Sequence, residues 1–286
     1  MTQSVWFITG SSTGFGRSLT EAVLKQGDRV VATARKPEQL DDLVQHYPDQ
    51  VKAVRLDVTD PQEVRDAIAA ALDAFGRIDV VVNNAGYGSL GAIEELSDEQ
   101  IRRQFDTNLF GALDVIRAVL PTLRQQGSGH ILNVSSIGGF VAYGGTGIYC
   151  STKFALEAVS EALAQEVAAL GIKVTIVEPG AFRTDFNGRS LVKPEQSIAD
   201  YATTSGEFLK WIDDMDGKQP GDPDKAAAAI IQAVHSPNPP LRLLLGADAV
   251  SLAETKLNSM RTELETWRQV SINTAFEGAE VETIGG

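Results

Sequence analysis

Short apolar runs alternate with stretches of helical periodicity along most of this chain of 286 residues. The runs end at glycine, asparagine or other polar residues, and they are apolar almost throughout instead of alternating with polar positions. Such runs are typical of strands that helices cover on both faces, as in a parallel sheet. We expect seven strands, at residues 5–9, 29–34, 51–56, 80–82, 130–134, 173–177 and 241–245.

Helical periodicity fills most of the intervals between these runs. In one interval Val64, Ile68 and Leu72 recur at the spacing of one helix face. Pro121 predicts a break in a long helix, because proline lacks the amide hydrogen that an interior helical position donates. The expected helices are at residues 15–26, 37–46, 61–75, 98–126, 148–170, 223–235 and 249–270.

This order of elements predicts an α/β fold: a doubly wound, parallel, seven-stranded sheet of the Rossmann type with helices on both faces. No linker-like stretch divides the chain, so we expect residues 1–286 to form a single domain. Residues 187–223 are polar and turn-rich, and we expect a substrate lid there with Phe208 and Trp211 as apolar contacts. Residues 247–286 should add a C-terminal helix, followed by a frayed acidic tail over the last ten residues.

The charge balance argues against several partners. The chain has 25 Lys and Arg against 38 Asp and Glu, a formal net charge of −13, which repels nucleic acids and anionic membranes. No apolar run approaches the ~20 residues of a membrane span, and the first residues enter a strand pattern without a signal peptide. The single cysteine, Cys150, permits no internal disulfide. We therefore expect a cytoplasmic protein, and three scattered histidines predict no metal site.

Candidate chemistry begins at the turn after the first strand, Thr9 to Gly16. Gly10, Gly14 and Gly16 have the spacing GxxxGxG, which is neither GxGxxG nor a phosphate-binding loop with its lysine. Glycines let the backbone approach a pyrophosphate, and the following helix offers free N–H groups and a partial positive charge. The turn favours dinucleotide binding, and a glycine-rich turn without a ligand is the alternative.

The end of the second strand indicates which dinucleotide is bound. An acidic residue at this point accepts a hydrogen bond from the ribose of NAD and repels the 2′-phosphate of NADP. Here the strand ends at Ala34 and Arg35, and a guanidinium can bind a phosphate with two hydrogen bonds. We expect NADP(H) to be favoured over NAD(H), the alternative being a solvated Arg35 without a ligand.

A tyrosine and a lysine form the candidate reaction centre. Tyr149 and Lys153 lie four residues apart on an expected helix, so their side chains share a face. An ammonium near a phenol favours the phenolate, so Tyr149 can act as a base on an alcohol or as an acid to a ketone. Ser136, at the end of the fifth strand, can hold the same oxygen. YxxxK also occurs by chance, and Tyr149 would then be an interfacial aromatic.

In combination these residues resemble the short-chain dehydrogenase/reductase family, in its single-domain branch, over residues 3–186 and the seventh strand. Phe15 replaces the family's usual isoleucine, and the stretch after Ala247 is longer than the family minimum. The matching motifs, in chain order, are TGSSTGFG from Thr9, Asp57-Val58, Asn83-Asn84-Ala85-Gly86, Asn108, Ser136, Tyr149-x-x-x-Lys153 and Pro179-Gly180-x-x-x-Thr184.

The resemblance implies a role for each matched residue. Tyr149 would be the acid/base, Ser136 would orient the substrate oxygen, and Lys153 would bind the nicotinamide ribose and lower the tyrosine pKa. Asn108 would hold a water in a proton relay through Lys153, and Thr184 would steady the nicotinamide amide. The implied cofactor-binding residues are Gly10, Ser11, Thr13, Gly14, Phe15, Gly16, Arg35, Asp57, Val58, Asn83, Ala85, Gly86, Tyr149, Lys153, Pro179, Gly180 and Thr184.

Within the family, the glycine-rich turn and residues 32–35 look most like 17β-hydroxysteroid and retinol dehydrogenases and bacterial carbonyl reductases. This likeness implies an NADP(H)-dependent enzyme that interconverts a hydrophobic ketone or aldehyde and its alcohol. It also implies a homo-dimer or homo-tetramer formed through the helices that carry Asn108 and Tyr149. The apolar substrate wall is expected from Tyr87, Phe140, Tyr143, Phe182 and Phe186.

Two other functions stay open. A non-catalytic NADP(H)-sensing interaction protein on the same fold would account for the acidic surface and the extra C-terminal helix. An isomerase or dehydratase of the wider superfamily would usually have a different glycine spacing and a larger C-terminal domain. The presence of both Tyr149 and Lys153 favours the oxidoreductase.

Overall fold

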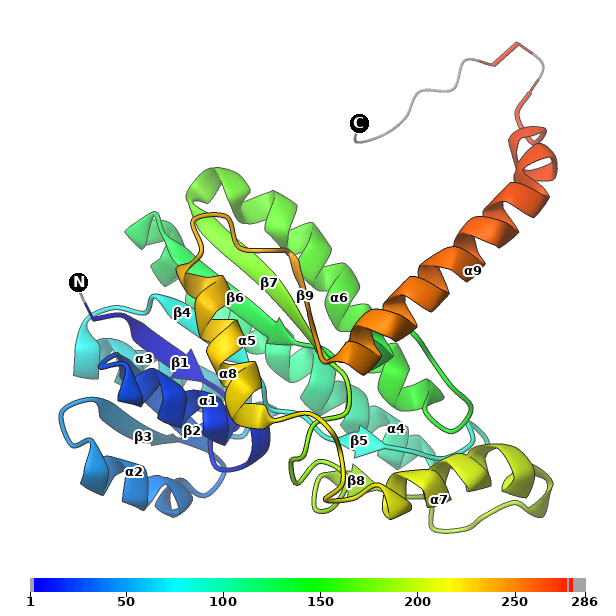
Figure 1. The fold of residues 1–286 in the computed structure, drawn as a ribbon. Helices are drawn as coiled ribbons and strands as arrows, with labels where there is room; N and C mark the ends of the chain where they lie inside the picture. The colour runs from blue at the N-terminus through cyan, green and yellow to red at the C-terminus, as the bar shows by residue number, and fades with distance from the viewer. Residues whose placement is uncertain (1–2, 277, 280–286) are drawn as a thin grey trace.

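The computed structural model describes residues 3–276, 278 and 279, and its centre is a parallel sheet of seven strands (Figure 1). The strand order is β3-β2-β1-β4-β6-β7-β9, and every neighbouring pair is parallel. All seven expected strands are confirmed. They are Val5–Ile8 (β1), Arg29–Ala34 (β2), Val51–Arg55 (β3), Val80–Asn83 (β4), Gly129–Val134 (β6), Ile172–Pro179 (β7) and Arg242–Leu245 (β9).

Helices cover both faces of this sheet, so the doubly wound Rossmann fold is confirmed. Trp6 and Phe7 are adjacent in β1, and each is fully buried in a different apolar cluster, one on each face of the sheet. Burial on both faces explains why the strands are apolar throughout. The helices of the first face are α1 (Gly14–Lys25), α2 (Asp41–His46) and α8 (Pro223–His235), and those of the second are α3 (Pro61–Phe75), α5 (Gly111–Gln126) and α6 (Gly147–Val167).

The helix break expected at Pro121 is wrong. Helix α4 (Asp98–Phe105) passes through a π-helical turn at Asp106–Phe110 into α5, and α5 contains Pro121. Pro121 is exposed, so the carbonyl that it leaves without a donor can bind water, while Val119 and Leu123 on either side are fully buried. The irregularity lies at the π-helical turn instead, which is where Asn108 occurs.

Part of the expected lid pairs with the segment after β4. Residues Gly88–Ser89 (β5) and Leu191–Val192 (β8) form a separate parallel sheet of two strands. Helix α7 (Glu207–Asp214) follows within the same lid segment. Neither short strand was expected, because two residues are too few to show a periodicity and their pairing depends on the folded chain.

The chain ends in a long helix, α9 (Ala247–Ile272), that projects from the rest of the molecule (Figure 1). This confirms the helix expected at residues 249–270. Of the expected acidic tail, residues 277 and 280–286 lie outside the described residues. None of the helices in the described part of the chain is both long enough and apolar enough to cross a membrane.

Candidate active site

The strand order reverses at β1, which lies between β2 and β4. In open α/β sheets ligands bind at such a switch point, beyond the carboxyl ends of the strands. The glycine-rich turn follows β1, Asn84 to Gly86 follow β4, and Ser136 follows β6. The fold therefore brings three motifs that are far apart in the sequence to one edge of the sheet.

The turn after β1 has a backbone that favours glycine. Gly10 and Gly14 have φ angles of +69° and +55°. A side chain on Gly16 would overlap the carbonyl oxygen of Gly10. Helix α1 begins here after Thr13, with no side-chain cap and no acidic residue in its first turn, so its N–H groups and partial positive charge are available to an anion. This cradle fits the pyrophosphate of a dinucleotide.

Two side chains that the sequence analysis did not single out hold the glycine-rich turn in place. The Thr9 hydroxyl accepts hydrogen bonds from the backbone N–H groups of Asn84 and Ala85, each at 2.9 Å. The Asn84 amide donates to the carbonyl oxygens of Thr9 and Gly10, at 2.8 and 3.1 Å. Within the turn, the Ser11 hydroxyl donates to Ile8 at 2.9 Å. These bonds tie the turn after β1 to the segment after β4.

The residues expected at the adenosine end lie along the ends of β2 and β3. Arg35 is exposed, and no ion pair in the described part of the chain involves it. The Asp57 carboxylate accepts from the backbone N–H and the hydroxyl of Thr59, at 3.0 and 2.7 Å. Val58 is buried against Gly111 of α5. Arg35 is thus exposed at the point where a ribose phosphate would be expected.

Tyr149, Lys153 and Ser136 meet at the carboxyl end of β6. Lys153 is buried on α6, and its Nζ donates to the carbonyl of Val134 at 2.8 Å and lies 5.9 Å from the centre of the Tyr149 ring. The Ser136 hydroxyl accepts from the N–H of Gly138 at 3.0 Å. The predicted triad is therefore assembled at one place, with two of its members on consecutive turns of one helix.

Burial shifts the pKa values of the tyrosine and the lysine in opposite directions. It raises the pKa of Tyr149 above the ordinary value, while the Ser136 hydroxyl acts to lower it. It lowers the pKa of Lys153 to about 8, against the opposing charge of Glu157. The lowered tyrosine pKa that the resemblance implied is thus not a property of the chain alone, because loss of hydration outweighs the neighbouring groups.

Asn108 lies beside this group in the π-helical turn, which reorients its side chain within the α4–α5 helix. Its amide nitrogen donates to the carbonyl of Tyr87 at 2.9 Å and to the Thr152 hydroxyl at 3.2 Å, and its oxygen accepts from the N–H of Tyr87 at 3.1 Å. A side chain on Gly86 would approach both Asn108 and Lys153. Asn108 is thus held near Lys153.

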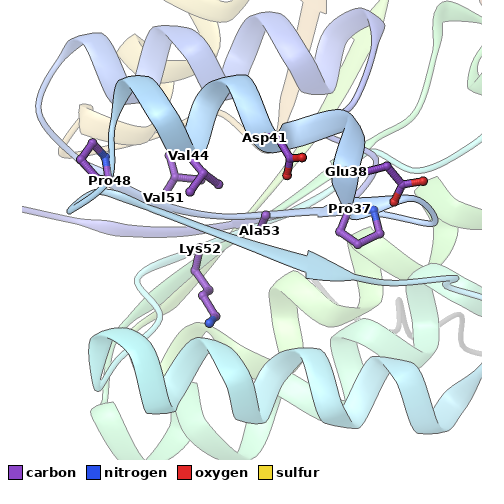
Figure 2. A pocket seen from close by; sticks show the side chains of 8 residues that line it. All are labelled: Pro37, Glu38, Asp41, Val44, Pro48, Val51, Lys52 and Ala53. Carbon is purple, nitrogen blue, oxygen red and sulfur yellow. The ribbon is translucent and has the colours of Figure 1, made fainter.

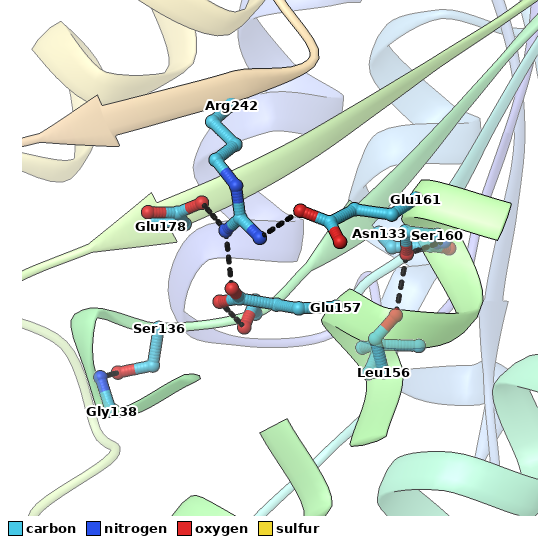
Figure 3. Close-up of polar contacts among 10 residues, drawn as sticks. Asn133, Ser136, Gly138, Leu156, Glu157, Ser160, Glu161, Glu178 and Arg242 are labelled. Carbon is cyan, nitrogen blue, oxygen red and sulfur yellow. Dashed lines mark hydrogen bonds and ion pairs between the residues drawn. The ribbon is translucent and has the colours of Figure 1, made fainter. Parts of the chain in front are cut away.

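A partly buried ionic cluster supports the loop that carries Ser136, and the sequence analysis did not predict it (Figure 3). Arg242 of β9 pairs with Glu157 of α6, with Glu178 of β7 at 2.7 Å and with Glu161 at 2.6 Å. Glu157 also accepts a hydrogen bond from the Ser135 hydroxyl at 2.7 Å. Glu157 therefore links the serine loop to the helix of Tyr149 and Lys153, and to the last strand of the sheet.

The segment after β7 faces the glycine-rich turn. Thr184 would be 3.6 Å from a side chain added to Gly14, so these two expected cofactor-binding residues face each other. Asp248, at the start of α9, accepts from the N–H of Ala181 at 2.7 Å and occupies the space where a side chain on Gly180 would extend. Asp248 was not predicted, since the contact depends on the path of the C-terminal segment.

Three of the predicted site side chains have contacts that the sequence analysis did not predict. The Asn83 amide donates to Asn133 at 2.8 Å, within the sheet. The Phe140 ring lies 5.8 Å from the guanidinium of Arg242. Phe182 packs edge-on against Phe15, with ring centres 5.0 Å apart. Phe182 thus contacts another predicted site residue, and the predicted binding roles of Asn83, Phe140 and Phe182 stay predictions.

The other expected wall residues are close to the reaction centre or the lid. The Phe186 ring lies 5.6 Å from the Tyr149 ring. Tyr143 stacks on Phe208 of α7 at 6.3 Å, which brings the segment of residues 187–223 beside the loop after β6. Tyr87 is partly buried, and its backbone holds Asn108. Aromatic side chains thus border the triad on the lid side.

Two surface hollows lie away from the triad. One, with a volume of about 600 Å³, lies between α2 and β3. Figure 2 shows the side chains that line it, with Lys52 pointing away from α2. A smaller hollow of about 340 Å³ is lined by Thr184, Arg189 and other residues at the start of the lid segment. No group of three or more His, Cys, Asp or Glu suited to a metal ion is found among the described residues.

Curated relatives cover almost the whole chain. Oxidoreductase BOA17 of Botryotinia fuckeliana is 44% identical over 272 residues, which are 95% of this chain and 99% of that protein. The 3-ketodihydrosphingosine reductase of Bacteroides thetaiotaomicron is 38% identical over 247 residues, which are 86% of this chain and 89% of that protein.

Solved structures are similar in fold and sequence. A short-chain dehydrogenase from Streptomyces avermitilis has a TM-score of 0.91 and 46% identity, over 96% of this chain and 100% of that one. An alcohol dehydrogenase from Thermococcus sibiricus complexed with 5-hydroxy-NADP has a TM-score of 0.70 and 27% identity, over 85% and 96%. A 3-ketoacyl-(acyl-carrier-protein) reductase from Brucella melitensis complexed with NADH has a TM-score of 0.70 and 26% identity, over 84% and 96%.

The family model described as short chain dehydrogenase matches residues 4–194. That range contains the glycine-rich turn, Asn108, Ser136, Tyr149 and Lys153, and it ends at the start of the lid segment. The chain belongs to the short-chain dehydrogenase family of oxidoreductases.

Proposed function

We propose that this protein is an NADP(H)-dependent oxidoreductase that interconverts a hydrophobic ketone or aldehyde and its alcohol, with Tyr149 as the acid/base. The observation that carries the proposal is the meeting of Ser136, Tyr149 and Lys153 beside the buried Asn108, at the end of β6 and next to the glycine cradle. A purely structural tyrosine and lysine would not require this juxtaposition.

The side chains divide the chemistry among them. A nicotinamide ring, when bound, supplies or accepts the hydride. In the reduction direction the Tyr149 hydroxyl gives its proton to the carbonyl oxygen, and the Ser136 hydroxyl donates a hydrogen bond to the same oxygen. The Lys153 ammonium stabilises the resulting phenolate. Asn108, held by Tyr87 and Thr152, positions a water that returns a proton through Lys153.

The preference for NADP(H) rests on the end of β2. Arg35 is exposed there, and the acidic residue that would repel a 2′-phosphate is absent from positions 34–36. Related structures are complexed with 5-hydroxy-NADP in one case and NADH in another, so the family accommodates both cofactors. The guanidinium of Arg35 is the group that favours the phosphate in this chain.

The substrate class follows from the aromatic residues beside the triad. Phe186 lies against Tyr149, and Tyr143 stacks on Phe208 of the lid segment, residues 187–223. These surfaces suit an apolar ketone or alcohol and offer little hydrogen bonding to a sugar. A relative in the family is named as a 3-ketodihydrosphingosine reductase, which is consistent with reduction of a ketone by this protein.

Self-association through α5 and α6 is part of the proposal. These helices carry large apolar side chains that are exposed in the isolated chain: Phe110, just before α5, is 52% exposed and Phe154 of α6 is 43% exposed. Both lie within two residues of a catalytic position, so a homo-dimer or homo-tetramer formed there would also stabilise the site. Cys150 is a buried free thiol, which is compatible with the cytoplasm.

The test is Tyr149→Phe, which removes the hydroxyl and keeps the ring. We expect NADPH-dependent reduction of aryl, retinoid and steroid ketones to fall by about 10²- to 10⁴-fold, since an acid/base group contributes that much. NADPH affinity, measured by fluorescence titration, should stay within about threefold of the wild type, because the ring remains. Equal turnover by the two proteins would contradict the proposal and favour a cofactor-sensing role.

A further inference from the structure

The segment after β7, from Gly180 to Thr184, lies beside the glycine cradle of the candidate active site. Thr184 faces Gly14, and the ring of Phe182 packs against that of Phe15. The segment begins where β7 ends and belongs to no helix, so contacts with other parts of the chain hold its backbone in place. These contacts therefore determine how the segment meets a ligand in the cradle.

Gly221, just before α8, makes the first set of contacts with this segment. Its N–H donates to the carbonyl oxygen of Ala181 at 3.0 Å, and its own carbonyl oxygen accepts from the N–H of Arg183 at 3.0 Å. The two bonds form a parallel bridge between Gly221 and Phe182. The backbone on either side of Phe182 is thus tied to the segment that leads into α8.

Asp248, in the first turn of α9, makes the second set of contacts together with the end of β9. Its carboxylate accepts from the N–H of Ala181 at 2.7 Å, and the carbonyl oxygen of Leu245 accepts from the N–H of Gly180 at 2.9 Å. Gly246 has a φ angle of +100°, which favours glycine, and it turns the chain from β9 into α9. This turn brings the carboxylate next to the end of β7.

The space around the Asp248 carboxylate is closely filled. A side chain on Gly180 or on Gly246 would overlap the carboxylate, and Asp248 is half-buried. Gly180 has no positive φ angle, so the carboxylate, and not backbone strain, opposes a side chain there. A hydrogen bond to a charged acceptor is stronger than one between neutral groups. The bond from Ala181 to Asp248 therefore attaches the segment to the base of α9.

These contacts leave one backbone donor of the segment without an acceptor. Both neighbours of Phe182 donate their N–H groups to the residues named above, whereas the N–H of Phe182 donates to no residue that the structure describes. A primary carboxamide has an oxygen that accepts such a bond. The nicotinamide ring carries a carboxamide of this kind, and the Phe182 N–H lies between Ala181 and Thr184, which faces the cradle.

We propose that Asp248 is a positioning residue for the nicotinamide end of the cofactor. By holding Ala181, it keeps the N–H of Phe182 where the carboxamide oxygen of the nicotinamide accepts from it. The inference rests on the proposed function, because it requires a bound nicotinamide dinucleotide. The alternative is that Asp248 stabilises only the start of α9, through its negative charge near a helix N-terminus.

The test compares a whole cofactor with a fragment that lacks the nicotinamide. Asp248→Ala removes the acceptor for the Ala181 N–H. By isothermal titration we expect the Kd for NADPH to rise about tenfold, while the Kd for adenosine 2′,5′-bisphosphate stays within about twofold, because the fragment has no carboxamide. If the wild type prefers NADH, the same comparison is made between NADH and ADP.

Two controls separate the hydrogen bond from the charge. Asp248→Asn keeps an acceptor oxygen and removes the charge, so both Kd values should stay within about threefold of the wild type. Glu254→Ala removes an exposed carboxylate farther along α9 and should change neither value. Circular dichroism checks that each variant is folded.

Gly180→Ala tests the same contact from the other partner, because its methyl group displaces the carboxylate. It should also raise the Kd for NADPH about tenfold. When Gly180→Ala is combined with Asp248→Ala, the methyl group has room. The Kd should then equal that of Asp248→Ala alone, where independent effects would multiply to about a hundredfold.

Wild-type affinity of Asp248→Ala for NADPH, equal losses for NADPH and the fragment, or multiplying effects of the two substitutions would overturn the inference. If Asp248→Asn binds NADPH as weakly as Asp248→Ala does, Asp248 acts only on the start of α9. A wild-type protein that binds neither NADPH nor NADH would instead contradict the proposed function, and the inference with it.

Discussion

Burial is the main cause of the pKa shifts of both Tyr149 and Lys153. Tyrosine becomes charged when it loses a proton and lysine when it gains one, so the two shifts have opposite directions. Burial penalises the phenolate and the ammonium alike, so it raises the pKa of Tyr149 and lowers that of Lys153 to about 8. The spacing YxxxK predicted that the two side chains would be neighbours. It did not predict that loss of hydration would outweigh the neighbouring groups in shifting each pKa.

Arg35 is the residue on which cofactor preference depends in our proposal. Arg35→Asp should raise the Kd for NADPH about 10- to 100-fold and change the Kd for NADH far less, because the carboxylate repels the 2′-phosphate and accepts from a ribose hydroxyl. Isothermal titration with both cofactors measures this. Lys52→Asp makes the same charge change at an exposed position of β3 and should leave the ratio of the two Kd values unaltered. If Arg35→Asp leaves the ratio of the Kd values for NADPH and NADH unchanged, Arg35 is a solvated surface residue without a role in cofactor preference.

At the scale of elements, Glu157 joins α6 to the loop after β6. Its carboxylate accepts from Ser135, next to Ser136, and opposes the fall in the pKa of Lys153, one helical turn away. Arg242 holds this carboxylate in place from β9. Three elements that are remote in sequence therefore determine the position of the loop that carries Ser136.

Glu157→Gln should lower kcat for ketone reduction about tenfold and move the alkaline loss of activity to lower pH. The sign follows from the charge: without the carboxylate the Lys153 ammonium is less stable, so its pKa falls further and the positive charge is lost earlier as pH rises. A pH profile of kcat measures the shift. Ser135, Glu161, Glu178 and Arg242 also face this carboxylate and stay unchanged.

The matched control is Glu161→Gln, which removes a carboxylate that pairs with the same arginine and is 47% exposed. Water screens that pair, so the pH profile should stay as in the wild type. If the two variants have the same profile, Glu157 acts only through overall stability.

Helices and strands were predicted correctly where an apolar pattern extends over the whole element. The prediction failed where contacts with other parts of the chain determine the local structure. The seven strands and the long helices were correct, because each has an apolar pattern that extends over its whole length. Pro121 did not break α5, since buried neighbours on both sides hold the helix. The pairing of β5 with β8 left no trace in the local pattern, because it joins residues about a hundred positions apart through backbone hydrogen bonds.

At the scale of the whole molecule, the buried Lys153 represents a cost in stability, which in our proposal the reaction requires. Lys153→Met should be more stable than the wild type at pH 7, on the order of 1–3 kcal/mol, since a lowered lysine pKa means that the folded state disfavours the charge. The lost hydrogen bond to Val134 offsets part of this gain. Activity should be lost in the same variant.

The stability difference between Lys153→Met and the wild type should depend on pH. Between the folded pKa of about 8 and the ordinary value of 10.5 the unfolded chain binds more protons than the folded one, so wild-type stability rises with pH in that window. The advantage of the variant is therefore fully present below pH 8 and disappears toward pH 10.5. Urea unfolding across this range measures it, with the exposed Lys25→Met as control. A variant less stable than the wild type at pH 7 would contradict the prediction.

The sequence by itself determined the fold class, the order of the strands along the chain and the residues that we propose as the triad, because these depend on local periodicity and on residue types at short spacing. The tertiary structure decided which side chains surround the triad. Glu157, Arg242, Asn84 and Asp248 reach the site only because strands distant in sequence become neighbours in the sheet. The contacts of Phe140 with Arg242 and of Phe182 with Phe15 were not predicted for the same reason: the partner of an aromatic ring depends on which elements pack beside it.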